Sequence, residues 1–170
     1  LSTPGLAFVG GLAGGIVLAS AAYKGKNTNN LILVGVGISS ISGAVTSLIL
    51  SLSDNPFAIN EIVFWMLGSL TDVSLFHTAT VAPFVIIGGA LLLGCRRDLN
   101  LLSLGGDTAA TIGVVMNSLK HRVVIGTALT VSAVTAIVGI IGFIGLMTPH
   151  IARPLARNEP GKTLAYSIPI

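Results

Sequence analysis

The sequence predicts an all-α fold, a polytopic bundle of transmembrane helices, from its composition and from the spacing of its charges. Only 9% of the 170 residues are charged, compared with about 25% in an ordinary soluble domain, and the mean hydropathy is +0.92. Charges are absent from residues 1–23, 27–53, 73–95 and 123–152. Each window is long enough to cross the ~30 Å hydrocarbon core of a bilayer as a helix of about 20 residues. This composition argues against a soluble enzyme and against a nucleic-acid-binding protein.

The spans should be helices, because the hydrocarbon core offers no water to backbone groups, which must therefore bond within their own segment. The windows are continuously apolar without a period of two, which counts against strands of a membrane barrel. We expect complete spans at about 3–22, 31–52, 74–95 and 123–147, followed by the start of another at 162–170. No basic region precedes the first apolar run, so we interpret the chain, 1–170, as a single membrane-domain fragment that does not begin with a signal peptide.

Aromatic residues indicate a short helix outside the spans. Phe57, Phe64 and Trp65 follow a connector that carries Asp54 and no basic residue. Amphipathic aromatic rings settle at the membrane–water interface. We therefore expect a short external helix at about 57–69.

The basic connectors set the orientation, because cytoplasmic loops carry an excess of Lys and Arg. Connectors 23–30 and 95–122 are basic and are predicted to be cytoplasmic, whereas 51–60 contains no base and is predicted to be external. Alternation of the four spans then places 148–162 outside, although it contains more basic than acidic residues. That exception to the charge rule requires an explanation beyond topology.

Small residues recur at a spacing of four on one face of the second span. These residues are Gly35, Ser39, Gly43 and Ser47. Such a face permits close approach of another helix or borders a transport pathway, and the spacing alone leaves both interpretations open.

The segment 96–122 is long for a connector between spans, and long ordered loops are usually functional. Glycines interrupt its apolar residues. We expect two short helices, near 101–111 and 115–120, joined by a glycine turn. A cytoplasmic helix pair of this kind is suited to docking another protein.

The sequence predicts no catalytic residue, no metal site and no cofactor, so we interpret the chain as a non-enzyme. The Gly-Lys-Thr run at 161–163 resembles the end of a phosphate-binding loop, but the earlier glycine of that motif is replaced by Ala156. The three histidines lie far apart in the sequence, without the spacing of a metal site. The single cysteine, Cys95, excludes an intrachain disulfide.

Several sequence blocks resemble one known family. Gly142–Arg153 reads GFIGLMTPHIAR, Leu99–Val114 reads LNLLSLGGDTAATIGV, and Leu31–Leu50 reads LILVGVGISSISGAVTSLIL. They resemble the Pro-His signature, the coupling segment and the pathway-lining helix of the FecCD-like permeases, which are the ABC importer subunits for iron-siderophores, haem and cobalamin. FWMLGSL at 64–70 is also similar, so the resemblance covers nearly the whole chain.

The resemblance implies a fragment of a membrane permease that takes up an iron-siderophore, haem or cobalamin, while a separate subunit hydrolyses ATP. The implied partners are ABC ATPase subunits, an extracytoplasmic substrate-binding protein, and a second permease in a homodimer or pseudo-dimer. Membrane lipid surrounds such a protein, and no nucleic acid is implied. The implied location is the bacterial cytoplasmic (inner) membrane, crossed several times.

The resemblance also suggests residue roles. The ATPase-coupling candidates are Leu102, Leu104, Gly105, Asp107, Ile112 and Gly113. Gly35, Ser39, Gly43 and Ser47 are the pathway-lining candidates. Arg153 and Arg157 are candidates for docking the binding protein, with helix capping or lipid-headgroup contact as the alternatives. The signature motif contributes Gly142, Gly145, Pro149 and His150, with Pro149 expected to break a helix and His150 to be structural or a substrate ligand.

This chain departs from the family pattern in the coupling segment. Gly106 stands where the family usually has an acid, and Ala110 stands where it usually has Arg. These departures remove any salt bridge at the two positions but leave the docking role in place.

Two other functions remain open. A zinc/manganese-type metal-ion permease would need His or acidic side chains along its pathway, and the spans contain almost none. A non-transport membrane scaffold would explain the hydrophobicity but not the long, glycine-interrupted segment 96–122.

Overall fold

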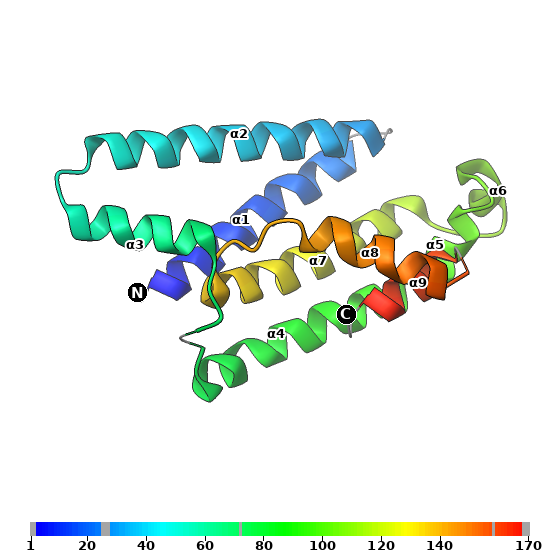
Figure 1. Ribbon diagram of the computed structural model, residues 1–170. Helices are drawn as coiled ribbons and strands as arrows, with labels where there is room; N and C mark the ends of the chain where they lie inside the picture. The colour runs from blue at the N-terminus through cyan, green and yellow to red at the C-terminus, as the bar shows by residue number, and fades with distance from the viewer. Residues whose placement is uncertain (1–2, 25–27, 72, 158, 168–170) are drawn as a thin grey trace.

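The computed structural model describes residues 3–24, 28–71, 73–157 and 159–167, and the predicted all-α fold is confirmed for them. The helices are α1 (Thr3–Lys24), α2 (Thr28–Leu52), α3 (Pro56–Leu67), α4 (Leu75–Gly94), α5 (Arg96–Leu102), α6 (Gly106–Thr111), α7 (Met116–Val138), α8 (Ile144–Leu155) and α9 (Pro160–Ser167). Figure 1 shows the long helices α1, α2, α4 and α7 with the short helices gathered at their ends or, for α8, along their side.

Helices α1, α2, α4 and α7 are each long and apolar enough to cross a membrane. Large apolar side chains lie exposed along them, as at Ile16, Leu33 and Ile86. Such exposure would be costly in water, but it is what a helix surrounded by lipid presents. The exposed surface therefore agrees with a membrane environment.

Helix α7 is the centre of the bundle and packs against α1 on one side and α4 on the other (Figure 1). On α4, Gly88 meets Gly126 of α7 so closely that a Cβ atom on Gly88 would lie 2.8 Å from the Gly126 carbonyl oxygen. On α1, Gly15 lies against the Ala128 side chain. Small residues therefore let the helix backbones approach, which is how membrane helices gain packing energy when lipid supplies no hydrophobic drive.

The fourth span differs from the expected range 123–147. Helix α7 begins at Met116 and ends at Val138, and Gly139 has a φ of 77°. Helix α8 begins only at Ile144, after Phe143 with a φ of 66°. The break escapes a search for charge-free windows because the residues that form it are glycine and apolar residues.

The turn between α7 and α8 is fastened to the end of α3. The Ile140 amide donates to the Trp65 carbonyl at 3.1 Å, and the Ser69 amide donates to the Val138 carbonyl at 2.8 Å. A Cβ atom on Gly68 would lie 2.7 Å from the Ile140 carbonyl oxygen. This close contact places α3 and the break after α7 at the same end of the bundle.

Helix α3 covers most of the predicted external helix 57–69, and local sequence explains where it starts. The Asn55 side chain caps it by accepting from the Phe57 amide at 3.0 Å. Pro56 stands in the first turn, where its missing N–H leaves no bond unmade. None of the residues of α3 is buried, so the helix lies on the surface of the bundle.

Helix α8 carries the chain back from that end to the opposite one. It leads to α9, which packs on α8 and on α5. In Figure 1 the orange α8 ends, and the orange-red α9 begins, beside the green α5. The expectation that 148–162 and 95–122 lie at opposite ends of the bundle is therefore wrong. The break after α7 was not predicted from the sequence, and so it was missed that the chain runs back to the other end of the bundle through α8.

Candidate functional site

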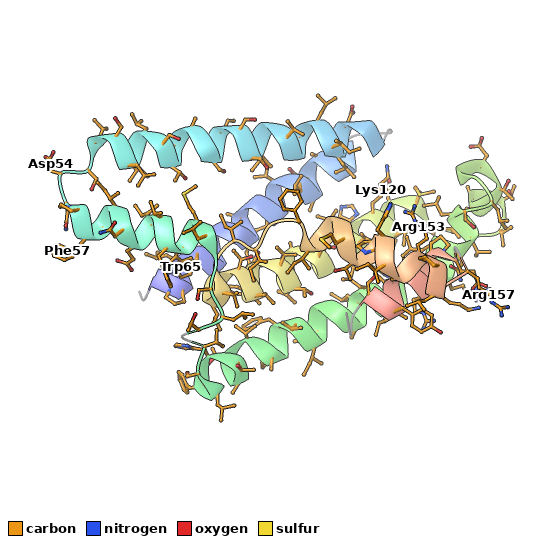
Figure 2. All side chains as sticks on the ribbon, viewed as in Figure 1. Asp54, Phe57, Trp65, Lys120, Arg153 and Arg157 are labelled. Carbon is orange, nitrogen blue, oxygen red and sulfur yellow. The ribbon has the colours of Figure 1, made fainter. Side chains whose placement is uncertain are left out.

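The basic residues of the described chain collect at one end of the bundle. That end holds the ends of α4 and α8, the starts of α7 and α9, and the whole of α5 and α6. Its basic residues include Arg96, Arg97, Lys120, Arg122, Arg153, Arg157 and Lys162. Figure 2 shows Lys120, Arg153 and Arg157 there and Asp54 at the opposite end. With α8 recognised, the charges agree with the positive-inside rule and 148–162 is no longer an exception.

The segment 96–122 forms two short helices, but their ranges differ from those expected. Helix α5 ends at Leu102, α6 starts at Gly106, and residues 116–120 belong to α7. Gly105 separates α5 from α6 with a φ of 105°, a conformation that side chains other than glycine rarely adopt. No single helix therefore contains both Leu104 and Ile112.

A Schellman motif ends α6 and turns the chain into α7. The Gly113 amide donates to the Ala110 carbonyl at 3.1 Å, and the Val114 amide donates to the Ala109 carbonyl at 3.0 Å. Gly113 has the positive φ, 97°, that this motif requires. The motif brings Val114 and Ala109 into one buried cluster with Cys95 and Leu119.

The coupling candidates divide into inward and outward residues. Leu102 packs against the buried cluster, so it holds the segment together. Leu104 and Ile112 point outward and are 62% and 53% exposed. Asp107 is exposed in the first turn of α6, where the helix dipole favours a carboxylate.

Val115 is a third exposed apolar residue of this segment, and it was not singled out from the sequence. It is 68% exposed and lies just after the Schellman turn. The sequence feature that could have identified it is its position, since it is an apolar residue between the glycine turn at Gly113 and the first turn of α7. We name Leu104, Ile112 and Val115 the outward apolar surface.

Arg153 and Arg157 lie at the basic end and not at the end that holds α3 (Figure 2). Arg153 is in the last turn of α8, where a cation is favoured by the helix dipole. It also lines a cavity of about 590 Å³ together with Leu99 of α5 and Pro160 of α9. A role in docking an external binding protein stays a prediction, but its premise that 148–162 and 95–122 lie at opposite ends of the bundle is wrong.

The signature residues serve the return of the chain through α8. The Gly142 carbonyl accepts from the Ile144 amide at 2.9 Å in the turn that precedes α8. Gly145 follows in the first turn, with open space where a Cβ would lie. Pro149 was expected to break a helix, but α8 continues through it to Leu155, and the break comes before Ile144. His150 is exposed.

A cavity of about 560 Å³ lies between α1, α2 and α7. Gly35 and Ser39 of α2 line it, together with Thr127 and Ser132 of α7. Gly43 lies outside that lining, and nothing stands within 4 Å of the position of a Cβ atom on it. Ser47 is likewise exposed and outside the lining. The structure thus brings half of the four-residue face to a cavity and leaves the other half open.

The free thiol Cys95 stands at the end of α4, where the segment 96–122 begins. Its side chain is fully buried and donates to the Leu91 carbonyl at 3.3 Å. Burial raises the pKa of the Cys95 thiol, while the charge of Arg122 lowers it and that of Asp98 raises it. Within the described residues, no group of three or more His, Cys, Asp or Glu could hold a metal ion.

Comparison with known proteins identifies the family. Residues 1–170 match the model of the FecCD transport family. The chain is 36% identical over 169 residues to the ferric enterobactin transport system permease protein FepD of Escherichia coli, covering 97% of this chain and 48% of that protein. It is 31% identical over 149 residues to the cobalamin import system permease protein BtuC of Halobacterium salinarum, covering 86% of this chain and 40% of that one.

A solved structure has the same fold. It is described as an inward-facing conformation of a metal-chelate type ABC transporter and matches with a TM-score of 0.77 at 29% sequence identity. The match covers 97% of this chain and 61% of the solved one. The chain spans about half the length of the curated relatives that it matches. It belongs to the FecCD transport family.

Proposed function

We propose that this chain is part of the membrane permease subunit of an ATP-binding-cassette importer for an iron-siderophore, haem or cobalamin. The observation that carries the proposal is the match of residues 1–170 to the FecCD transport family. The named relatives are permease proteins for ferric enterobactin, cobalamin and, in Yersinia pestis, hemin, the last 34% identical over 149 residues. Each is about twice as long as this chain, so transport requires the rest of the permease.

The two ends of the bundle suit two different partners. The basic end, with α5, α6 and the outward apolar surface, faces the cytoplasm and docks ABC ATPase subunits. The opposite end, with Asp54 and α3, faces a substrate-binding protein on the outer side. The host membrane is the bacterial inner membrane, and a second permease in a homodimer or pseudo-dimer completes the pathway.

The chemistry of the coupling segment supports ATPase docking. Interfaces draw most of their binding energy from a few residues at their buried centre. The outward apolar surface offers three exposed apolar side chains to such a centre, on a segment that packs around its own buried cluster. A segment packed in this way transmits the movement of a docked subunit into α4 and α7, the helices to which it is joined.

The cavity between α1, α2 and α7 supports a pathway on this side of α2. Apolar side chains and small polar groups such as the Ser39 hydroxyl line it. A substrate carried as a bulky chelate has its metal already coordinated, so the residues along its path need not include metal ligands. The lining residues of the cavity include no His, Cys, Asp or Glu.

The test is uptake by the full-length permease reconstituted in proteoliposomes with its ATPase and its binding protein. Ferric siderophore, haem and cobalamin are offered separately, with free Zn²⁺ and Mn²⁺ as controls. We expect uptake of one of the three chelates, dependent on ATP and on binding protein. Uptake of the free metal ions alone, or no ATP-dependent uptake by an assembled complex, would refute the proposal.

A further inference from the structure

Two side chains of α5 hold the first turn of α9 from across the fold. The Gly161 amide donates to Asn100 Oδ1 at 2.6 Å, and Arg96 Nε donates to the Gly161 carbonyl at 3.0 Å. Arg96 and Asn100 are four residues apart and so lie on one face of α5. Both backbone polar groups of one residue are thus bound by side chains more than sixty residues away in sequence.

The contact is close enough to require glycine. Gly161 is buried, and a Cβ atom there would lie 2.6 Å from the Arg96 carbonyl oxygen and 2.8 Å from Asn100 Oδ1. Any larger residue must push α9 away from α5. The Gly-Lys-Thr run that looked like part of a phosphate-binding loop therefore owes its glycine to helix packing.

The contact also meets a need of each helix. The first amides of a helix have no partner within it, and Asn100 supplies one to the Gly161 amide. Helix α5 has only seven residues, which is too short to be stable without contacts to other elements. Each helix therefore fixes the position of the other.

From this geometry we infer that Arg96, Asn100 and Gly161 form a clamp that transmits movement of the coupling segment to α9 and α8, an inference that rests on the proposed function. Covalent connections carry movement of α5 and α6 only to α4 and α7. The clamp adds a second route, through space, because α9 packs on α8 as well as on α5. Arg96 and Asn100 are positioning residues in this account, and neither contacts substrate.

The test compares variants that break the clamp with matched variants that keep it. Asn100→Leu removes the acceptor while keeping the same branching and number of side-chain heavy atoms, whereas Asn100→Asp keeps an acceptor for the Gly161 amide. Gly161→Ala forces the helices apart from the other side, and Gly94→Ala is its control because a Cβ atom on Gly94 has open space. Arg97→Gln is the control for Arg96→Gln on the same helix.

The first measurement is substrate uptake per ATP hydrolysed by the full-length complex in proteoliposomes. We expect about a five- to tenfold lower ratio in Asn100→Leu, Gly161→Ala and Arg96→Gln, the change expected when a hydrogen bond that favours one of two states is lost. ATPase binding, read by pull-down, stays normal, and the three control variants match the wild type. An unchanged ratio in the clamp variants, or loss of ATPase binding in them, overturns the inference.

The second measurement does not depend on transport. Hydrogen exchange is followed by mass spectrometry in the full-length permease with and without its ATPase. ATPase binding should slow exchange at 160–167 in the wild type and in Asn100→Asp, but not in Asn100→Leu, while 96–111 is protected in all three. Equal protection of 160–167 in all three overturns the clamp. Lack of ATP-dependent uptake by the wild-type complex would instead refute the proposed function. The exchange experiment does not measure uptake, so the two failures can be told apart.

Discussion

Gly11 of α1 lies directly against Ser132 of α7, so closely that a Cβ atom on Gly11 would stand 2.7 Å from the Ser132 Cβ. One residue earlier, Gly10 has nothing within 4 Å of the same position. Helix α1 contains two pairs of glycines at GxxxG spacing, Gly10/Gly14 and Gly11/Gly15, and they are therefore not equivalent. Gly11 and Gly15 contact side chains of α7, whereas a Cβ atom on Gly10 or Gly14 would have nothing within 4 Å.

Gly11→Ala is expected to weaken the packing of α1 on α7. Forcing an extra carbon into a tight contact costs about 1–3 kcal/mol, so the full-length protein in detergent should unfold at a lower temperature. Gly10→Ala is the matched control and should be neutral or slightly stabilising, since alanine favours the helix. Equal melting temperatures for the two variants would contradict the packing described for α1.

The relocation of Arg157 gives a topology prediction. Single cysteines at Ser118→Cys, Arg157→Cys and Asp54→Cys, each in a Cys95→Ala full-length protein, are treated with a membrane-impermeant thiol reagent in intact cells. Because α8 returns the chain to the basic end, Arg157→Cys should behave as Ser118→Cys does and stay unlabelled, while Asp54→Cys is labelled. Labelling of Arg157→Cys together with Asp54→Cys would restore the external position expected from sequence.

Ser39→Leu tests whether the cavity between α1, α2 and α7 borders the substrate path. The larger side chain would fill part of the ~560 Å³ space, so uptake should fall by about tenfold or more while the complex still assembles. Ser40→Leu is the control, because Ser40 is exposed on α2 and does not line the cavity. Similar uptake by the two variants would exclude this cavity from the path. For Gly43 and Ser47, a pathway role stays a prediction.

Cys95 offers a pH-dependent probe of the coupling segment. Burial raises the pKa of Cys95, and the thiolate is the form that reacts with maleimides. Labelling should therefore be slow at neutral pH and become faster only at pH values above the usual pKa range of a cysteine thiol. Asp98→Asn removes a charge that raises the pKa and should speed labelling. Arg122→Gln removes a charge that lowers it and should slow labelling. The opposite order for the two variants would refute this electrostatic assignment.

Charge-free windows predicted helices where α1, α2 and α4 lie, because a helix that faces lipid must avoid charge over its whole length. They failed at the fourth window. Gly139 and Phe143 end one helix and begin another with positive φ, yet both are apolar and leave the window uninterrupted. The break is visible only in backbone geometry and in its bonds to Trp65.

The two short helices of segment 96–122 were predicted from its length and glycines, but the directions of its side chains were not. Leu102 and Leu104 are two residues apart, yet one packs inward and the other points out. The positive φ of Gly105 decides this division, and periodicity cannot show it in helices of six or seven residues. The clamp at Gly161 was equally hidden, since it joins residues more than sixty positions apart.

Substitutions on the outward apolar surface test the central claim, that this surface couples the permease to an ATPase. The measurement is stimulation of ATP hydrolysis by loaded binding protein in the reconstituted full-length complex, together with pull-down of the ATPase. Leu104→Asp places a charge where an apolar anchor should be buried, so stimulation should fall at least about tenfold. Asp107→Asn, on the same segment, should change it little. Normal stimulation and normal pull-down in Leu104→Asp would contradict the account.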